Sequence, residues 1–143
     1  MKLVIGCDEA AYRLKEAMKE TIIQLGHEVK DIGVYHEAPS LYPDIAQKLC
    51  ACITDGSCER GILLCGTGIG MAITANKIPG IRAAVGHDLF KSNDCQVLCM
   101  GARVIAAQYA RLLVERWLEC SFAGGASAEK VARIMEIEQE YRR

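Results

Sequence analysis

Short continuous runs of hydrophobic residues alternate along this chain with longer segments in which hydrophobic residues recur every three or four positions. The continuous runs predict buried strands, and the periodic segments predict amphipathic helices. We expect strands at residues 2–7, 27–33, 60–65, 81–86 and 95–101. We expect helices at residues 11–26, 44–56, 69–77, 107–121 and 128–143.

Strands that alternate with helices predict right-handed βαβ units, a parallel sheet and helices on both of its faces. The chain has 143 residues and no linker, repeat or low-complexity segment, so we expect one α/β domain over residues 1–143. Ligands of such sheets bind beyond the carboxyl ends of the strands. Three strand ends carry polar residues or glycines, at 6–9, 65–68 and 86–88, and should converge on that edge.

Composition and charge narrow the possible functions. The net charge of -1 argues against nucleic acid as a partner. No apolar run approaches the roughly 20 residues of a membrane span, and the N-terminus has too short an apolar stretch for a signal peptide. We therefore expect a cytoplasmic protein without a membrane partner. The eight cysteines form no CxxC pair and should be reduced thiols, and the three histidines have no metal-ligand spacing, so we expect no metal site.

A glycine-rich turn, Gly66-Thr67-Gly68-Ile69-Gly70, directly follows Cys65 at the end of the third expected strand. The turn matches neither the Walker A pattern nor the dinucleotide-binding pattern. Because it leads into a helix, its bare backbone N–H groups favour a phosphate or a developing oxyanion. Cys65 stands next to the same helix N-terminus, where the positive potential favours a thiolate.

A thiolate beside such a loop can attack a carbonyl carbon, or it can remove a proton from the carbon next to a carbonyl. A nucleophilic cysteine normally has a histidine base, and no histidine is adjacent to Cys65 in the sequence. Proton abstraction is therefore the better match, with the loop N–H groups holding an enediolate. The alternative is a buried cysteine that only fills the core.

Four segments carry a wider pattern: GILLCGTGIGMAITANK, IGCDEAAYRLKE, LYPDIA and NDCQVLCMGARVI. In the same order, they resemble four segments of one family. These are its signature, its Gly-x-Asp-His-Ala-Gly-x-x-Leu-Lys start, its Tyr-Pro-Asp segment and its Asn-Asp-x-Asn-Val-Leu-x-x-Gly-x-Arg block. That family is the ribose-5-phosphate isomerase B and galactose-6-phosphate isomerase (RpiB/LacAB) sugar-phosphate isomerases. The resemblance extends over nearly the whole chain.

The resemblance implies a Rossmann-like three-layer sandwich with a five-stranded parallel sheet. It also implies a homodimer, or a tetramer, with active sites at the subunit boundary and the C-terminal helix at a dimer interface. The implied activity is an intramolecular oxidoreductase that interconverts aldose and ketose phosphates through a cis-enediol, without a cofactor. Cys65 would move a proton between C1 and C2, with Thr67 beside the ring-opening site. The residues expected to contact the substrate are Asp8, Glu9, Tyr42, Gly66, Gly68, Gly70, Asn93, Lys130 and Arg133.

Departures from the family pattern point to a shifted substrate. The family's Asp-His is Asp8-Glu9 here, and Ser92 stands where the family carries the histidine that opens the sugar ring. A four-carbon sugar phosphate cannot form the usual ring through its phosphorylated end, so it needs no such histidine. His87 could supply an acid, although a strand-end histidine more often faces solvent or caps a helix.

The C-terminal segment departs as well, because the family's Gly-Gly-Arg-His-x-x-Arg reads GGASAEK here. Lys130 can replace an arginine only as a point charge, and Arg133 could partly compensate. Two roles are open for Arg103, which could contact the substrate or hold a loop or subunit contact. The apolar stripe of the last helix, which includes Val131 and Ile134, could likewise pack on its own domain or on a second subunit.

A different class of function is also open. The chain could be a catalytically silent homologue that binds a sugar, or one subunit of a hetero-oligomeric isomerase. The galactose-6-phosphate isomerases that the chain resembles work as two different subunits, one of which lacks the cysteine. Here Cys65 and the full loop are kept, which favours an enzyme.

Overall fold

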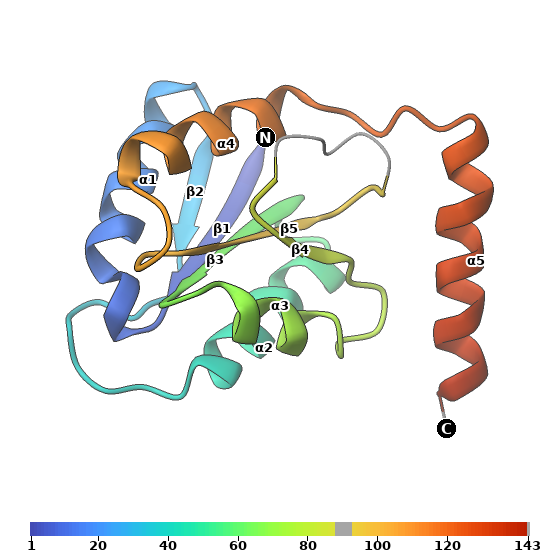
Figure 1. Ribbon diagram of the computed structural model, residues 1–143, viewed down its shortest axis with the longest axis horizontal. Helices are drawn as coiled ribbons and strands as arrows, with labels where there is room; N and C mark the ends of the chain where they lie inside the picture. The colour runs from blue at the N-terminus through green and yellow to red at the C-terminus, as the bar shows by residue number, and fades with distance from the viewer. Residues whose placement is uncertain (88–92, 143) are drawn as a thin grey trace.

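A parallel sheet runs through the middle of the molecule, with helices on both of its faces (Figure 1). The computed structural model describes residues 1–87 and 93–142. In these residues the strands are β1 (Lys2–Cys7), β2 (Glu28–Asp31), β3 (Arg60–Cys65), β4 (Ala83–Val85) and β5 (Val97–Gly101). The helices are the 3-10 turn η1 (Glu9–Ala11), α1 (Tyr12–Gln24), α2 (Tyr42–Thr54), α3 (Ile69–Ala75), α4 (Ala107–Glu119) and α5 (Ala126–Tyr141).

The predicted elements are all found, and most of the differences lie at their ends. The first helix begins with the 3-10 turn because the Asp8 side chain accepts a hydrogen bond from the Ala10 N–H group at 3.1 Å. The same helix ends at a left-handed glycine, Gly26, with φ of +86°. Pro43 lies in the first turn of α2, as expected. The fourth strand begins later than predicted, at Ala83, and the preceding Arg82 N–H group bonds to the Gln96 side chain.

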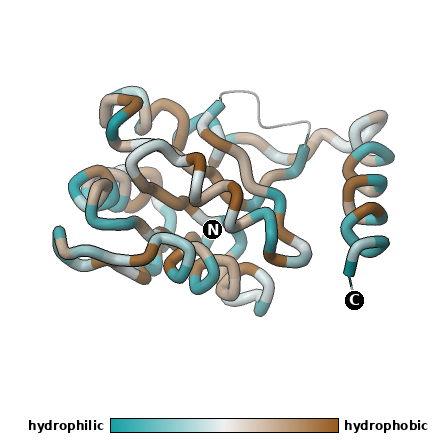
Figure 2. Tube along the Cα trace, turned by 60° about the horizontal axis from the view of Figure 1, so that its bottom comes forward, coloured by the Kyte–Doolittle hydropathy of each residue, from teal (hydrophilic) through white to brown (hydrophobic). Residues whose placement is uncertain are grey.

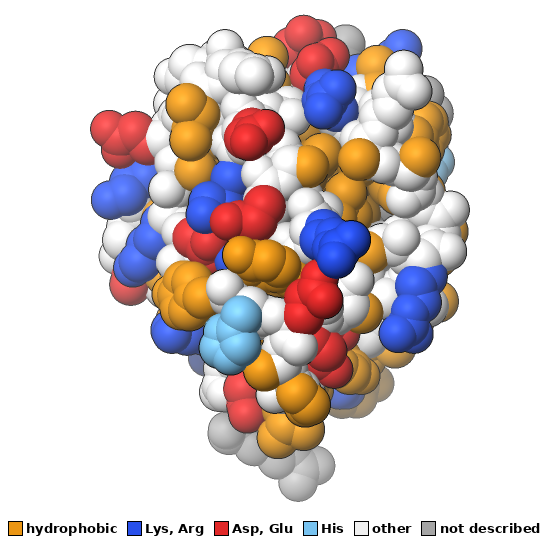
Figure 3. Space-filling model, turned by 90° about the vertical axis from the view of Figure 1, so that its left-hand side faces the viewer, with side chains coloured by type: hydrophobic (Ala, Val, Ile, Leu, Met, Phe, Trp, Pro, Cys, Tyr) orange, Lys and Arg blue, Asp and Glu red, His pale blue; other side chains and the backbone are white. Residues whose placement is uncertain are grey.

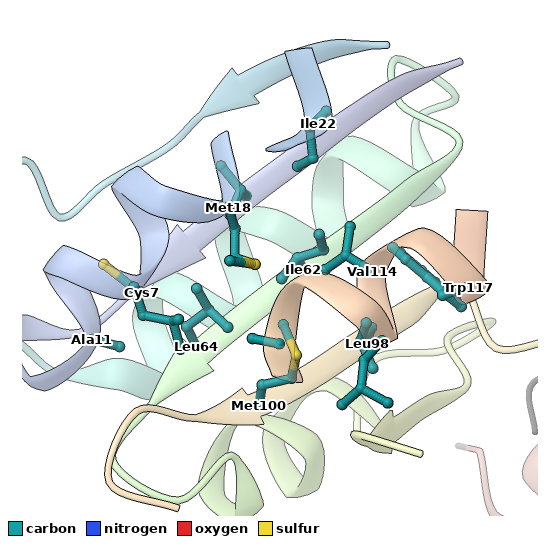
Figure 4. Close-up of a cluster of buried hydrophobic side chains, with 14 of the residues drawn as sticks. Cys7, Ala11, Met18, Ile22, Ile62, Leu64, Leu98, Met100, Val114 and Trp117 are labelled. Carbon is teal, nitrogen blue, oxygen red and sulfur yellow. The ribbon is translucent and has the colours of Figure 1, made fainter. Parts of the chain in front are cut away.

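The strand order is β2-β1-β3-β5-β4, with all strands parallel. Alternate residues of each strand therefore point to opposite layers. One layer is formed by α1 and α4, which cover a core that includes Ile62, Leu64 and Trp117 (Figure 4). The other layer is formed by α2 and α3, which cover a core that includes Leu63 and Cys65. The predicted three-layer α/β sandwich is thus confirmed.

Helix α5 stands apart from these layers (Figure 1). Its described contacts with its own chain lie at the segment that enters β4, where Glu138 accepts a hydrogen bond from the Gly80 N–H group at 3.1 Å. Val131 is buried, but Ile134 and Ile137 are exposed. Figure 2 shows hydrophobic positions recurring along this separate helix. Most of its apolar stripe therefore remains uncovered by the chain itself.

No helix in the described residues is both long enough and apolar enough to cross a membrane.

Candidate functional site

The carboxyl ends of β1 and β3 lie side by side at the centre of the sheet. Cys7 pairs with Leu64, and the Asp8 N–H group donates to the Leu64 carbonyl at 3.1 Å, so Asp8 lies level with Cys65. The chain leaves β1 toward β2 on one side, while β3 lies on the other side. Parallel sheets bind ligands at such a change of direction. The predicted convergence of the first and third strand ends is confirmed.

Cys65 lies at the base of the glycine loop, and its side chain faces that loop. Its Sγ accepts a hydrogen bond from the Gly68 N–H group at 3.1 Å. Gly68, with φ of +82°, is the residue from which α3 begins. The bond and the helix N-terminus both stabilise negative charge on the sulfur. Cys65 is only 5% exposed, so the thiol is largely shielded from solvent.

The loop itself is clamped between two neighbouring elements. A Cβ atom added to Gly70 would lie 2.5 Å from the Tyr42 ring, and one added to Gly101 would lie 2.5 Å from the carbonyl carbon of Thr67. Glycine is needed at both positions because the two surfaces touch without room for a side chain. The N–H groups of Thr67 and Gly70 donate to no acceptor in the described residues. They are therefore free to bind a developing oxyanion.

Two adjacent acidic residues, Asp8 and Glu9, follow β1 at the rim of this loop. Burial raises the pKa of Asp8, and the neighbouring charge of Glu9 adds to that effect, while Arg103 opposes it. The pKa of Glu9 is instead lowered by its own backbone N–H group, by Ser40 and by Arg103. Acidic and basic side chains are mixed on the face seen in Figure 3, so this face carries charges of both signs.

Arg103 is the site residue that sequence reasoning did not resolve. Its backbone N–H group donates to the Gly66 carbonyl at 3.0 Å, and its side chain lies next to the same glycine. A Cβ atom added to Gly66 would lie 3.4 Å from Nη1 of Arg103. Within the described part of the chain, the guanidinium makes no hydrogen bond or ion pair. The arginine of the GARVI segment could be seen in the sequence, but the direction of its side chain depends on how β5 ends.

The other predicted substrate contacts lie elsewhere in the chain. Asn93 precedes β5 and therefore lies at the amino edge of the sheet, opposite Cys65. Lys130 and Arg133 lie on α5, which meets its own chain at the same edge. Arg133 pairs with Glu136 and Glu140 of its own helix, at 3.1 and 2.9 Å.

Asn93 and α5 belong to one cluster at this amino edge. Arg82 joins them, because it donates to the Asp94 carbonyl at 2.9 Å and contacts the Met135 sulfur at 3.3 Å. One chain thus gathers Asp8, Glu9, Tyr42, Cys65 and Thr67 at one edge of the sheet, and Asn93 with α5 at the other.

Two further expectations concern the edge strand and metals. His87 is exposed and follows β4, which β5 separates from the Cys65 strand. Ser92 and Asp88 lie outside the described residues. In the described ranges, no three histidine, cysteine or acidic side chains are grouped so that they could hold a metal ion.

Comparison with known proteins connects this geometry to a family. The family model for Ribose/Galactose Isomerase matches residues 3–134. A protein named ribose-5-P isomerase B from Listeria innocua is 45% identical and covers 99% of this chain and 100% of its own length. A D-erythrulose-4-phosphate isomerase from Pectobacterium atrosepticum is 44% identical and covers 98% of this chain and 97% of its own.

A solved structure agrees with these sequence matches. The ribose-5-phosphate isomerase B of Clostridium thermocellum superposes with a TM-score of 0.95 at 39% identity, covering 99% of this chain and 100% of that one. The match therefore includes the strand ends, the glycine loop and helix α5. The resemblance expected from the sequence is confirmed, and the chain belongs to the Ribose/Galactose Isomerase family.

Proposed function

We propose that this protein is an aldose–ketose isomerase of a sugar phosphate, with Cys65 as the base. The observation that carries the proposal is the Cys65 sulfur, which accepts the Gly68 N–H group at the start of the glycine loop. A thiolate held there can take a proton from a carbon next to a carbonyl. The names of the Listeria and Pectobacterium relatives, both isomerases of phosphorylated sugars, support the same activity.

The mechanism is a proton transfer between neighbouring carbons. The Cys65 thiolate removes the proton from C2 of the open-chain aldose, and the electrons form an enediolate across C1 and C2. The free N–H groups of Thr67 and Gly70 stabilise its oxygen. The same thiol then returns the proton to C1, and the hydroxyl proton passes from O2 to O1, which completes the ketose. Asp8 and Tyr42 are the proposed contacts for the remaining sugar hydroxyls.

The substrate that we favour is a four-carbon sugar phosphate. The two relatives differ in substrate, ribose 5-phosphate against erythrulose 4-phosphate, and their identities of 45% and 44% do not decide between them. The chemistry of the chain does favour the tetrose, because the family's ring-opening histidine is replaced by serine at position 92. A tetrose 4-phosphate is already open. Arg103, over Gly66, is the proposed partner of its phosphate.

We also propose a homodimer in which each site is built from two copies. The reason is that Asn93, Lys130 and Arg133 lie at the edge opposite Cys65 in one chain, together with the exposed apolar stripe of α5. A second copy packed against that stripe would bring these groups to the loop of its neighbour. The eight free cysteines favour the cytoplasm as the compartment. A silent sugar-binding homologue is less well supported, because the complete loop and thiol geometry are kept.

The test is proton exchange at carbon, followed by NMR in deuterated water. Ribose 5-phosphate, a hexose 6-phosphate, erythrose 4-phosphate and the unphosphorylated sugars are each incubated with enzyme. We expect deuterium at C2 of erythrose 4-phosphate and exchange about 10²–10⁴-fold slower with Cys65→Ala, which is the range that a lost general base costs. Cys99→Ala, another buried cysteine, is the matched control. Equal exchange by Cys65→Ala and wild type would remove the thiolate mechanism.

A further inference from the structure

Glu9 follows Asp8 as the first residue of η1, and its carboxylate is held in place. Its Oε2 accepts hydrogen bonds from the Ser40 hydroxyl at 2.8 Å and from the Ser40 N–H group at 3.2 Å. These bonds, with its own backbone N–H group, lower the pKa of Glu9, so the side chain is ionised at neutral pH. The rim of the site therefore carries a fixed negative charge.

This charge is bonded to the segment that forms one wall of the site. Ser40 lies two residues before Tyr42, whose ring packs on Gly70 of the loop. The same segment is held further back, where Lys15 donates to the Val34 carbonyl. Releasing Glu9 would break both bonds to Ser40 and free the chain immediately before Tyr42. The position of the carboxylate is thus tied to the position of a substrate-contacting ring.

An opposite charge lies on the other side of the same space. The Arg103 guanidinium lies over Gly66, next to Cys65 in the chain, and acts on the charges of both Asp8 and Glu9. Asp8 lies level with Cys65, and Glu9, the next residue, begins η1 and is anchored on Ser40. The phosphate of a sugar whose reacting carbons lie at Cys65, with a hydroxyl on Asp8, is therefore attracted by Arg103 and repelled by Glu9.

We propose that Glu9 is the residue that sets the length of the phosphorylated sugar that the site accepts. In a four-carbon substrate the phosphate meets Arg103 before it reaches Glu9. Each added carbon moves the phosphate outward, toward the anchored carboxylate, where like charges repel. Glu9 therefore selects by exclusion and does not bind the substrate. This inference rests on the proposed isomerase function.

The experiment compares two stable acids that resemble the open-chain substrates, 4-phosphoerythronate and 5-phosphoarabinonate. Their affinities are measured by calorimetry for the wild type, Glu9→Gln and Glu37→Gln. Glutamine keeps an oxygen for Ser40 but removes the charge. Glu37 is the matched control, because it is an exposed carboxylate of the same segment that pairs with Arg13 at 3.0 Å. Thermal melting checks that each variant is folded.

We expect the wild type to prefer the four-carbon acid. In Glu9→Gln this preference should fall by about tenfold or more, since removing a like-charge contact helps the longer acid most. Glu37→Gln should keep the wild-type preference. An unchanged preference in Glu9→Gln would overturn the inference while leaving the isomerase proposal intact. Binding of neither acid to the wild type, together with no proton exchange into any sugar of the panel above, would overturn both proposals, which separates the two failures.

Discussion

At the scale of single residues, the most unusual feature is Lys15, a charged side chain with no exposed surface. Its Nζ donates to both oxygens of Asp31, at 2.9 and 2.8 Å, and Lys19 donates to the same carboxylate at 2.9 Å. Burial alone would raise the pKa of Asp31, but the hydrogen bonds from Lys15, Lys19 and the Gly33 N–H group outweigh it and lower the pKa. The carboxylate therefore stabilises the folded state only while it is ionised.

The sign of the pH dependence follows from that lowered pKa. The contribution of Asp31 to the free energy of unfolding is complete above its unfolded-state pKa of about 3.9. It is lost as the pH falls through the lower folded-state pKa. We expect Asp31→Asn to reduce the free energy of unfolding at pH 7 by about 3 kcal/mol, because Lys15 loses its buried partner. The deficit relative to wild type should shrink below about pH 4. Denaturant titrations of both proteins at pH 7 and pH 3 measure the deficit and its decrease at low pH. An equal deficit at the two pH values would contradict the assignment.

At the scale of elements, the glycine loop depends on contacts with β5 that the sequence does not display. Gly101→Ala places a Cβ atom 2.5 Å from Thr67 and should push the loop out of position. We expect a loss of about 1–3 kcal/mol in unfolding free energy together with a large loss of kcat. Gly26→Ala separates the two effects, because Gly26 has nothing within 4 Å and costs stability only through its φ of +86°. Activity lost equally in both variants would mean that stability, and not loop position, is responsible.

The glycine loop and its surroundings also show which structural features can be predicted from the sequence and which cannot. Hydrophobic runs such as residues 60–65 fix the strands, because a buried parallel strand needs apolar side chains on both faces. The order of Cys65 and Gly66–Gly70 predicts a thiol beside an anion-binding turn, since both are neighbours along the chain. The side chain of Arg103 and the Glu9–Ser40 bonds could not be predicted in this way. Their partners are 37 and 31 positions apart, and only the folded sheet brings them together.

At the scale of the whole molecule, the two edges of the sheet hold complementary halves of one proposed site. Cys65 and Asp8 lie at the carboxyl edge. In the same chain, Asn93 lies at the amino edge and Lys130 lies on α5. A twofold dimer relates equivalent surfaces, so each copy can lend its amino-edge half to the carboxyl-edge half of the other. In this arrangement neither half acts without the opposite half of a second chain.

This arrangement predicts complementation between two inactive variants. Cys65→Ala lacks the base, and Asn93→Ala combined with Lys130→Ala lacks the lent groups. The two chains are co-expressed with different affinity tags and purified through both tags. In the mixed dimer one site carries every defect, but the other has an intact Cys65 from one chain and intact lent groups from its partner. We expect about half of the wild-type turnover, because one site of two is whole. A site built within a single chain would leave the mixed dimer as inactive as its parents, since each chain would keep its own defect.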